Sequence, residues 1–167
     1  VKTSRLFFYL NKNMNKDTFC AMAFSEIFLG PDGGIKPCCS ATQDLGNINK
    51  NSIIEILHGD KATQLRDNII NGKWDSMCYT CKKLESMGAR SERSDHIHRY
   101  NDFSSADKDT FRLEKIDLRW SNTCNLTCTY CDSYFSSKWA NIQGKEKINA
   151  NKSYAEESIF EFLEKNK

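Results

Sequence analysis

Eight cysteines are the residues of this chain best suited to chemistry. They stand at positions 20, 38, 39, 78, 81, 124, 128 and 131 of 167, with one pair spaced C-x2-C and one triplet spaced C-x3-C-x2-C. Close pairs and triplets bring several thiolates to one point, as a metal ion or an iron–sulfur cluster requires and a disulfide does not. An even number of cysteines could also form a set of disulfides, but the chain is long for a disulfide scaffold and nothing in it argues for secretion. The spacing therefore indicates a metal or iron–sulfur protein.

The triplet Cys124, Cys128 and Cys131 is the most specific of these signals. It lies on a predicted loop that directly follows a predicted strand at Arg112–Ser121. Three thiolates on a short loop can hold three irons of a [4Fe–4S] cluster and leave the fourth iron open. The alternative is a three-cysteine zinc site completed by a fourth residue, such as Asp132 or a histidine.

This segment resembles the radical S-adenosylmethionine superfamily in its spacing, in the aromatic Tyr130 before the last cysteine, and in the strand before the loop. The resemblance implies that the triplet holds the reactive [4Fe–4S] cluster and that Tyr130 lies at the cofactor site. S-adenosylmethionine would bind the open iron, and one electron from the cluster would cleave it to a radical that abstracts a hydrogen atom from substrate. The cofactor would supply that chemistry, so no side chain is assigned as catalytic.

A second cysteine site is expected in the first half of the chain. Residues 19–39 are predicted to form a β-hairpin, with strands at Ala23–Leu29 and Ile35–Cys38 joined by a glycine-rich turn. Because Pro37 cannot donate to a ladder, the return strand is predicted to be an edge. The hairpin brings Cys38 back beside Cys20.

The pattern Cys20-x12-Gly33-x4-Cys38, followed by Gly46-Asn47-Ile48 and by Cys78-x2-Cys81 with Glu85, resembles the twitch or SPASM auxiliary-cluster domain. The resemblance implies a second [4Fe–4S] cluster, which would relay electrons or anchor the substrate. Its ligands would be Cys20, Cys38, Cys78 and Cys81.

Cys39 is assigned to neither of the two predicted cysteine sites. Adjacent strand residues point to opposite faces, so only one of Cys38 and Cys39 should reach a given cluster. Cys38 is chosen because it keeps the Gly-x4-Cys spacing. A structural zinc ion remains the alternative at the four-cysteine site, since thiolates bind zinc and iron–sulfur clusters alike.

The remaining elements are predicted to be helices. A capping box at Ser52 begins the first, with Ile53, Ile54 and Leu57 as its apolar side. Further helices are predicted at Asp60–Asn71, Lys82–Tyr100 and Ser153–Lys165, and a polar linker at Asn101–Thr110. The expected fold class is α+β. A small β-hairpin and helices around the four-cysteine site form residues 1–110, and residues 111–167 form the first β/α unit of a radical S-adenosylmethionine type barrel.

That second part departs from the family it resembles. Only 57 residues follow Thr110, whereas a full β/α barrel takes roughly 200 or more. The Gly-Gly-Glu segment usual on the second barrel strand is missing. A lone parallel strand cannot satisfy its hydrogen bonds. Either the barrel continues in residues not shown, another chain completes it, or Arg112–Ser121 pairs with the hairpin.

The charge composition argues against two classes of binding partner. With 24 Lys+Arg against 22 Asp+Glu, there is no basic surface for nucleic acid or an anionic membrane. Neither a transmembrane run nor a signal peptide is recognised, which favours a cytoplasmic protein with reduced thiols. The Lys82-Lys83 and Arg90–Arg93 segments are interpreted as a mixed charged surface.

The expected function is that of an iron–sulfur protein of the radical S-adenosylmethionine class. Its expected partners are a peptide, protein or small-molecule substrate and, as a candidate, an electron-donor protein. The alternative is a non-catalytic zinc- or iron–sulfur-binding interaction module. Whether this chain is itself an enzyme stays open, because most of the barrel is not in it.

Overall fold

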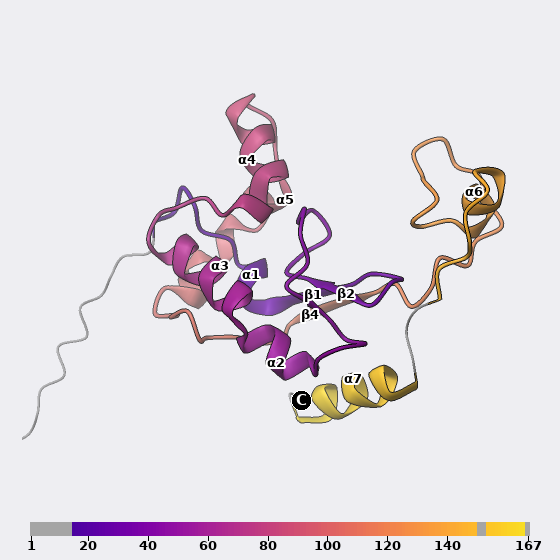
Figure 1. Cartoon of the computed structure of the whole chain (residues 1–167). Helices are drawn as coiled ribbons and strands as arrows, with labels where there is room; N and C mark the ends of the chain where they lie inside the picture. Colours follow the sequence, from indigo (N-terminus) through magenta and orange to yellow (C-terminus); the bar gives the residue numbers. More distant parts are fainter. Residues whose placement is uncertain (1–14, 150–152, 166–167) are drawn as a thin grey trace, which may run out of the picture.

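The computed structural model describes residues 15–149 and 153–165, which form a mixed α+β structure around a small sheet (Figure 1). The sheet has the strand order β3-β2-β1-β4, with β1 at Glu26–Leu29, β2 at Gly34–Lys36, β3 at Gly46–Asn47 and β4 at Lys115–Leu118. The pairs β1–β2 and β2–β3 are antiparallel, whereas β1 and β4 are parallel.

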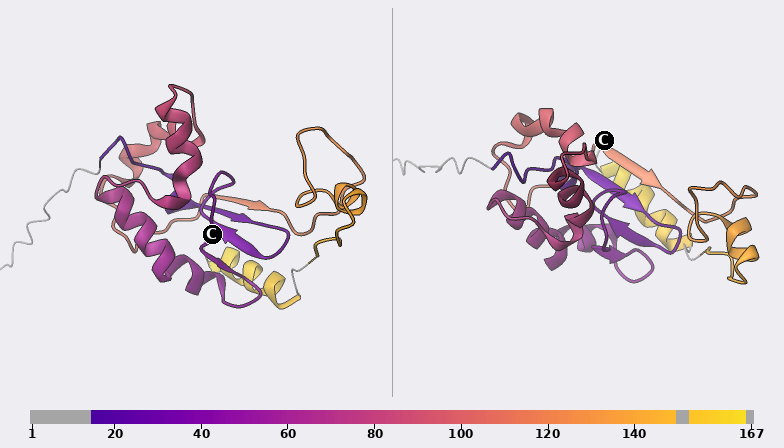
Figure 2. Two further views of the ribbon diagram at one scale, coloured as in Figure 1. Left: turned by 45° about the horizontal axis from the view of Figure 1, so that its top comes forward. Right: turned by 90° about the horizontal axis from the view of Figure 1, so that it is seen from above.

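Helices cover the sheet from two sides. Figure 1 shows α2 and α7 below the sheet and α4 above it, and in both views of Figure 2 the segment carrying α6 projects beyond the sheet. No helix of the described residues is long and apolar enough to cross a membrane. The helices are α1 (Met22–Ser25), α2 (Ile53–His58), α3 (Asp60–Ile70), α4 (Tyr79–Ser86), α5 (Glu92–Asp95), α6 (Ser137–Ile142) and α7 (Ser153–Lys165), with 3-10 turns η1 (Ser76–Cys78) and η2 (Ile97–Phe103).

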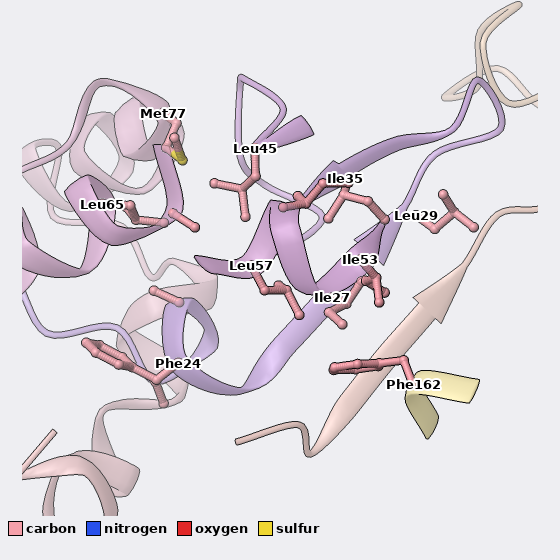
Figure 3. Packing of buried hydrophobic residues seen from close by; sticks show 14 of the residues in the cluster. Phe24, Ile27, Leu29, Ile35, Leu45, Ile53, Leu57, Leu65, Met77 and Phe162 are labelled. Atoms are coloured by element: carbon pink, nitrogen blue, oxygen red, sulfur yellow. The ribbon is translucent and has the colours of Figure 1, made fainter. Parts of the chain in front are cut away.

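The hydrophobic core lies between the sheet and the lower helices. Ile27 of β1 packs with Leu57 of α2 and Phe162 of α7 in a continuous cluster of buried side chains (Figure 3). Burial of this apolar surface is the main force that holds the sheet and helices together. The same β1 strand carries Phe28 and Glu26 on its other face, and both are buried as well.

Several local predictions are confirmed. Ser52 and Glu55 form the predicted capping box at the start of α2, and α7 has the predicted bounds. The apolar side of α2 was wrong at one position: Ile54 is exposed, and Ile56 is buried in its place.

The predicted helix at Lys82–Tyr100 is wrong as a single element. Gly88 adopts a φ of 74°, and the N–H groups of Gly88 and Ala89 donate to the carbonyls of Glu85 and Leu84. This is how a helix ends at a left-handed glycine. Ser91 then caps the separate helix α5.

The hairpin also differs from its prediction. The segment before β1 forms the short helix α1, where the Ser25 hydroxyl donates to the Ala21 carbonyl. The return strand is not an edge, because β3 pairs with its outer side. Pro37 lies just beyond the end of β2 at Lys36, so its missing N–H removes nothing from the ladder.

The strand after the polar segment pairs with the hairpin, which is the third of the three arrangements expected. Ile116 of β4 lies opposite Ile27 of β1, and the Arg119 N–H continues the pairing by donating to the Leu29 carbonyl. Phe103, inside the predicted linker, is buried against Phe24. The sheet therefore contains strands from both halves of the chain.

Candidate metal centres

Four cysteines from distant segments surround one pocket. Cys20 precedes α1, Cys38 follows β2, Cys78 ends η1, and Cys81 lies in the first turn of α4. All four line this pocket, which we call the first pocket. The loop after Cys38 is held to the segment before Cys78 by a hydrogen bond from the Thr42 N–H to the Met77 carbonyl, 3.0 Å long.

The thiols of the first pocket are electrostatically coupled. Burial, with the neighbouring Cys78, raises the pKa of Cys20 to about 12. Burial, with Cys38, likewise raises the pKa of Cys78 to about 12. Burial and the nearby Cys20 raise the pKa of Cys38 well above its ordinary value. Without a cation between them these thiols hold their protons, so metal or cluster binding must release protons from this pocket.

Arg93 of α5 supplies a positive charge at the rim of the first pocket. Its Nε donates to Glu85 Oε1 at 2.9 Å, and its Nη2 contacts Glu85 Oε2. Its Nη1 donates to the Phe19 carbonyl at 3.0 Å, and its guanidinium stacks over the Trp74 ring. Because Phe19 adjoins Cys20 and Glu85 follows Cys81 by one helical turn, Arg93 ties two ligand-bearing segments together.

The interpretation of Arg90–Arg93 as exposed charged surface was wrong for Arg93, which is buried. The sequence pattern included Glu85, which accompanies the C-x2-C pair. The spacing of residues did not indicate that Arg93 would be the partner of this carboxylate. Arg90 does lie on the surface and pairs with Asp95.

The donor set of the first pocket fits an iron–sulfur cluster. Four soft thiol ligands from three segments face one largely buried space, with a guanidinium beside it to offset their negative charge. Within residues 15–149 and 153–165, no group of three or more His, Cys, Asp or Glu side chains is arranged to hold a single metal ion.

The cysteine triplet lies on a loop that its own hydrogen bonds shape. Buried Asn122 donates to the Ser133 carbonyl at 3.0 Å and accepts from the Ile148 N–H at 2.8 Å, which closes the base of the loop. Ser136 caps α6 and donates to the Leu126 carbonyl at 2.8 Å. The partners of these hydrogen bonds all lie within residues 122–148, so the loop is shaped by its own segment.

The backbone at two of the three cysteines is held by α6. The Ser137 hydroxyl donates to the Cys124 carbonyl at 3.0 Å, and the Trp139 indole N–H donates to the Cys128 carbonyl at 3.0 Å. The exposed Tyr130 hydroxyl is hydrogen-bonded to Cys128, which raises the pKa of this tyrosine. The Cys131 N–H donates to the Cys128 carbonyl at 3.1 Å, so α6 holds the backbone at the first two cysteines and a tight turn places the third.

A second pocket opens beside the triplet. Its lining includes Cys124, Tyr130 and Cys131, together with Asp132 and the leftover Cys39. Asp132, the suggested alternative ligand, accepts the N–H groups of Tyr134 and Phe135 through its Oδ1 and so stabilises the turn after the triplet.

Two contacts fix the triplet loop to the sheet. The Tyr134 hydroxyl donates to Asp32 Oδ1 at 2.8 Å, in the β1–β2 turn, and the Phe135 ring meets the Phe28 ring edge-on at 6.5 Å. Gly30 allows this approach, because a Cβ there would lie 2.2 Å from the Tyr134 hydroxyl. No sequence pattern predicted these contacts, which join segments about a hundred residues apart.

Comparison with known proteins identifies the first of these segments. The family model of the SPASM domain, described as an iron–sulfur cluster-binding domain, matches residues 20–82. No curated protein and no solved structure matches the chain. The matched range contains all four cysteines of the first pocket and ends before the triplet. The chain thus carries a SPASM domain, and binding of an iron–sulfur cluster is the property that this domain brings.

Proposed function

We propose that this chain is the cluster-bearing part of a radical S-adenosylmethionine enzyme, with an auxiliary cluster in its SPASM domain and a reactive cluster on the triplet loop. The observation that carries the proposal is that four cysteines of a SPASM domain line one buried pocket, beside a C-x3-C-x2-C loop docked on the same sheet. SPASM domains are typical of auxiliary clusters in that class of enzyme.

Each cysteine group then has a distinct role. Cys20, Cys38, Cys78 and Cys81 would hold the auxiliary [4Fe–4S] cluster, with Arg93 beside it to stabilise its negative charge. Cys124, Cys128 and Cys131 would hold the other cluster. When bound, that cluster and S-adenosylmethionine supply the radical that removes a hydrogen atom from substrate.

The residues of the chain position these groups and control access to them. Trp139 and Ser137 hold the backbone of the triplet, and exposed Tyr130 stands at the mouth of the second pocket, where it can contact the cofactor. The pocket is open, so a peptide, protein or small molecule can approach the triplet from outside. An electron-donor protein would reach the auxiliary cluster.

One edge of the sheet is available for pairing with the further strands of a barrel. β4 pairs with β1 on one side, and within the described residues it is the last strand of the sheet order. Its outer edge presents the backbone groups that a following parallel strand would need. We propose that further β/α units add there.

Metal analysis of the anaerobically purified chain tests this function. Two clusters should give about eight irons and matching sulfide per chain. Cys78→Ala and Cys128→Ala should each remove about half of the iron, from different sites. With a strong reductant and S-adenosylmethionine, the protein should release 5′-deoxyadenosine, and Cys128→Ala should abolish this.

Other results would contradict the proposal in defined ways. Zinc without sulfide would mean that the chain is a zinc-stabilised interaction module. About four irons, lost in Cys78→Ala and kept in Cys128→Ala, would leave a SPASM cluster and remove the reactive site. Both outcomes can be read from metal content and absorption without any substrate.

A further inference from the structure

Helix α4 carries a cysteine of the first pocket on one side and two lysines on the other. Cys81 lines the pocket, and Lys82 and Lys83, which directly follow it, are exposed. At about 100° per residue, Tyr79 and Lys83 lie about 160–200° around the helix from Cys81. We call Tyr79, Lys82, Lys83 and Met87 the outer face of α4. Figure 1 shows α4 at the top of the molecule, on the side away from α2 and α7.

The positive charge of this outer face is not balanced by a carboxylate. Glu85 is the one carboxylate within α4, and it is paired with Arg93. Within residues 15–149 and 153–165, neither Lys82 nor Lys83 forms an ion pair. The Lys83 Nζ lies 6.0 Å from the centroid of the Tyr79 ring. Because the whole chain has a net charge of only +2, this face is a local concentration of positive charge.

Two large side chains with apolar surface flank the lysines. Tyr79 is 58% exposed and Met87 is 63% exposed. Aromatic residues and methionine are enriched where proteins bind one another. Weak electron-transfer complexes have small interfaces, and charge complementarity steers their association. A small apolar contact beside unpaired lysines therefore fits a transient partner of negative charge.

The first pocket itself adds positive charge near α4. Lys73 is exposed and lines this pocket, as does Arg93. The lining also includes a carboxylate, Asp75, but both of its oxygens accept hydrogen bonds from within the protein. Its Oδ1 accepts from the Met77 N–H and its Oδ2 from the Asn68 side chain. The surroundings of the auxiliary site thus favour the approach of an acidic protein.

The outer face lies close to the site where electrons would be stored. Tyr79 directly follows Cys78 in the sequence, and Cys78 lines the first pocket. An α-helix with its side chains is about 10–12 Å across, so one helix diameter separates a partner on the outer face from the pocket. The lining of the second pocket contains no residue of α4, so a partner docked on α4 does not occupy the lining beside the triplet.

We propose that the outer face of α4 is the docking surface for an acidic one-electron carrier protein, which exchanges electrons with the auxiliary cluster. This inference rests on the proposed function, because it needs a cluster in the SPASM domain. In the reducing direction, one electron leaves the reduced centre of the carrier and enters the auxiliary cluster. The carrier is oxidised by one electron, the cluster is reduced by one, and no bond is formed or broken.

Electron exchange with a small acidic [2Fe–2S] ferredoxin tests this docking surface. The cluster-loaded chain and the ferredoxin are mixed anaerobically in a stopped-flow instrument, one reduced and the other oxidised, in the direction that their reduction potentials favour. The second-order rate constant should fall as salt is added, because salt screens the attraction. In Lys82→Glu/Lys83→Glu the rate constant at low salt should be about tenfold lower. The difference should nearly vanish at about 1 M salt.

Lys50→Glu/Lys165→Glu is the matched control. Lys50 lies just before α2 and Lys165 ends α7, and both are exposed. This double substitution changes the net charge by the same amount, so its rate constant should stay within about twofold of that of the unmodified protein. Iron per chain and the extent of reduction by excess dithionite should be equal in all three proteins.

Three results overturn the proposal. Equal rate constants in Lys82→Glu/Lys83→Glu and the control, with iron content unchanged, would show that the outer face is not the docking surface, while the proposed function would stand. The same conclusion follows if the unmodified protein exchanges no electrons with the ferredoxin in either direction. Iron content unaffected by Cys78→Ala would remove the auxiliary cluster, and with it both this inference and the proposed function.

Discussion

Arg93→Ala should destabilise the protein strongly and weaken the auxiliary site, although Arg93 is not a metal ligand. Its guanidinium links Glu85 of α4 to the Phe19 carbonyl beside Cys20. The substitution leaves the Glu85 carboxylate, whose side chain is only 20% exposed, without its charged partner. It also removes the donor to the Phe19 carbonyl and the stacking on Trp74.

The size of the effect follows from these contacts. Removing one partner of a buried ion pair costs about 3–5 kcal/mol. Partial exposure of Glu85 places the cost at the lower end, so we expect a loss of about 3 kcal/mol in the free energy of unfolding. For a chain of this size that lowers the melting temperature by about 6–12 °C. Arg93→Lys keeps the positive charge but loses the paired hydrogen bonds to Glu85. Its free energy of unfolding should therefore lie between those of the unmodified protein and Arg93→Ala.

Arg90→Ala is the matched control. Arg90 lies three residues earlier, is 85% exposed and also pairs with a carboxylate, Asp95. An exposed pair of this kind contributes about 0–1 kcal/mol. Urea unfolding of the anaerobically purified variants, together with iron per chain, measures both effects. If Arg93→Ala and Arg90→Ala have equal stability and equal iron content, the assignment of Arg93 as a structural link between ligand segments is refuted.

Three further predictions concern the pH response, the triplet loop and the core. Burial raises the pKa of Glu85, but hydrogen bonds and charge from its arginine partner outweigh it and hold the pKa below 4.5. The pair therefore stabilises the protein above that pH and is lost as pH falls through the lowered pKa, so unfolding of Glu85→Gln should depend less on pH in this acid range. Tyr134→Phe removes the hydrogen bond to Asp32 and should cost about 1 kcal/mol; hydrogen exchange should rise at residues 122–136, and unchanged exchange would contradict the docking. Leu57→Ala, at a 1% exposed core position, should cost about 2–5 kcal/mol in urea unfolding, whereas Ile54→Ala, 49% exposed on the same helix, should cost under about 1 kcal/mol.

Local sequence signals predicted local structure well. The Ser52 capping box and the apolar period of the last helix identified α2 and α7, because caps and helical faces depend on residues within a few positions of one another. One local signal was missed: Gly88 divides the long charged segment into two helices through its left-handed backbone.

The sequence by itself determined the chemistry available to this protein. Cysteine spacing alone indicated metal or cluster binding, and the first group lies within the matched SPASM domain. In the structure, Cys20, Cys38, Cys78 and Cys81 line one pocket.

Only the tertiary structure decided how the two cysteine groups lie relative to each other. The pairing of β4 with β1, the burial of Arg93 and the hydrogen bond from Tyr134 to Asp32 each join residues far apart in sequence. Such contacts depend on how whole helices and strands pack. The local sequence around a strand or a charged side chain is compatible with many different partners and does not choose among them. Spacing fixes which ligands lie close together along the chain, and packing decides which ligands from other segments complete the site.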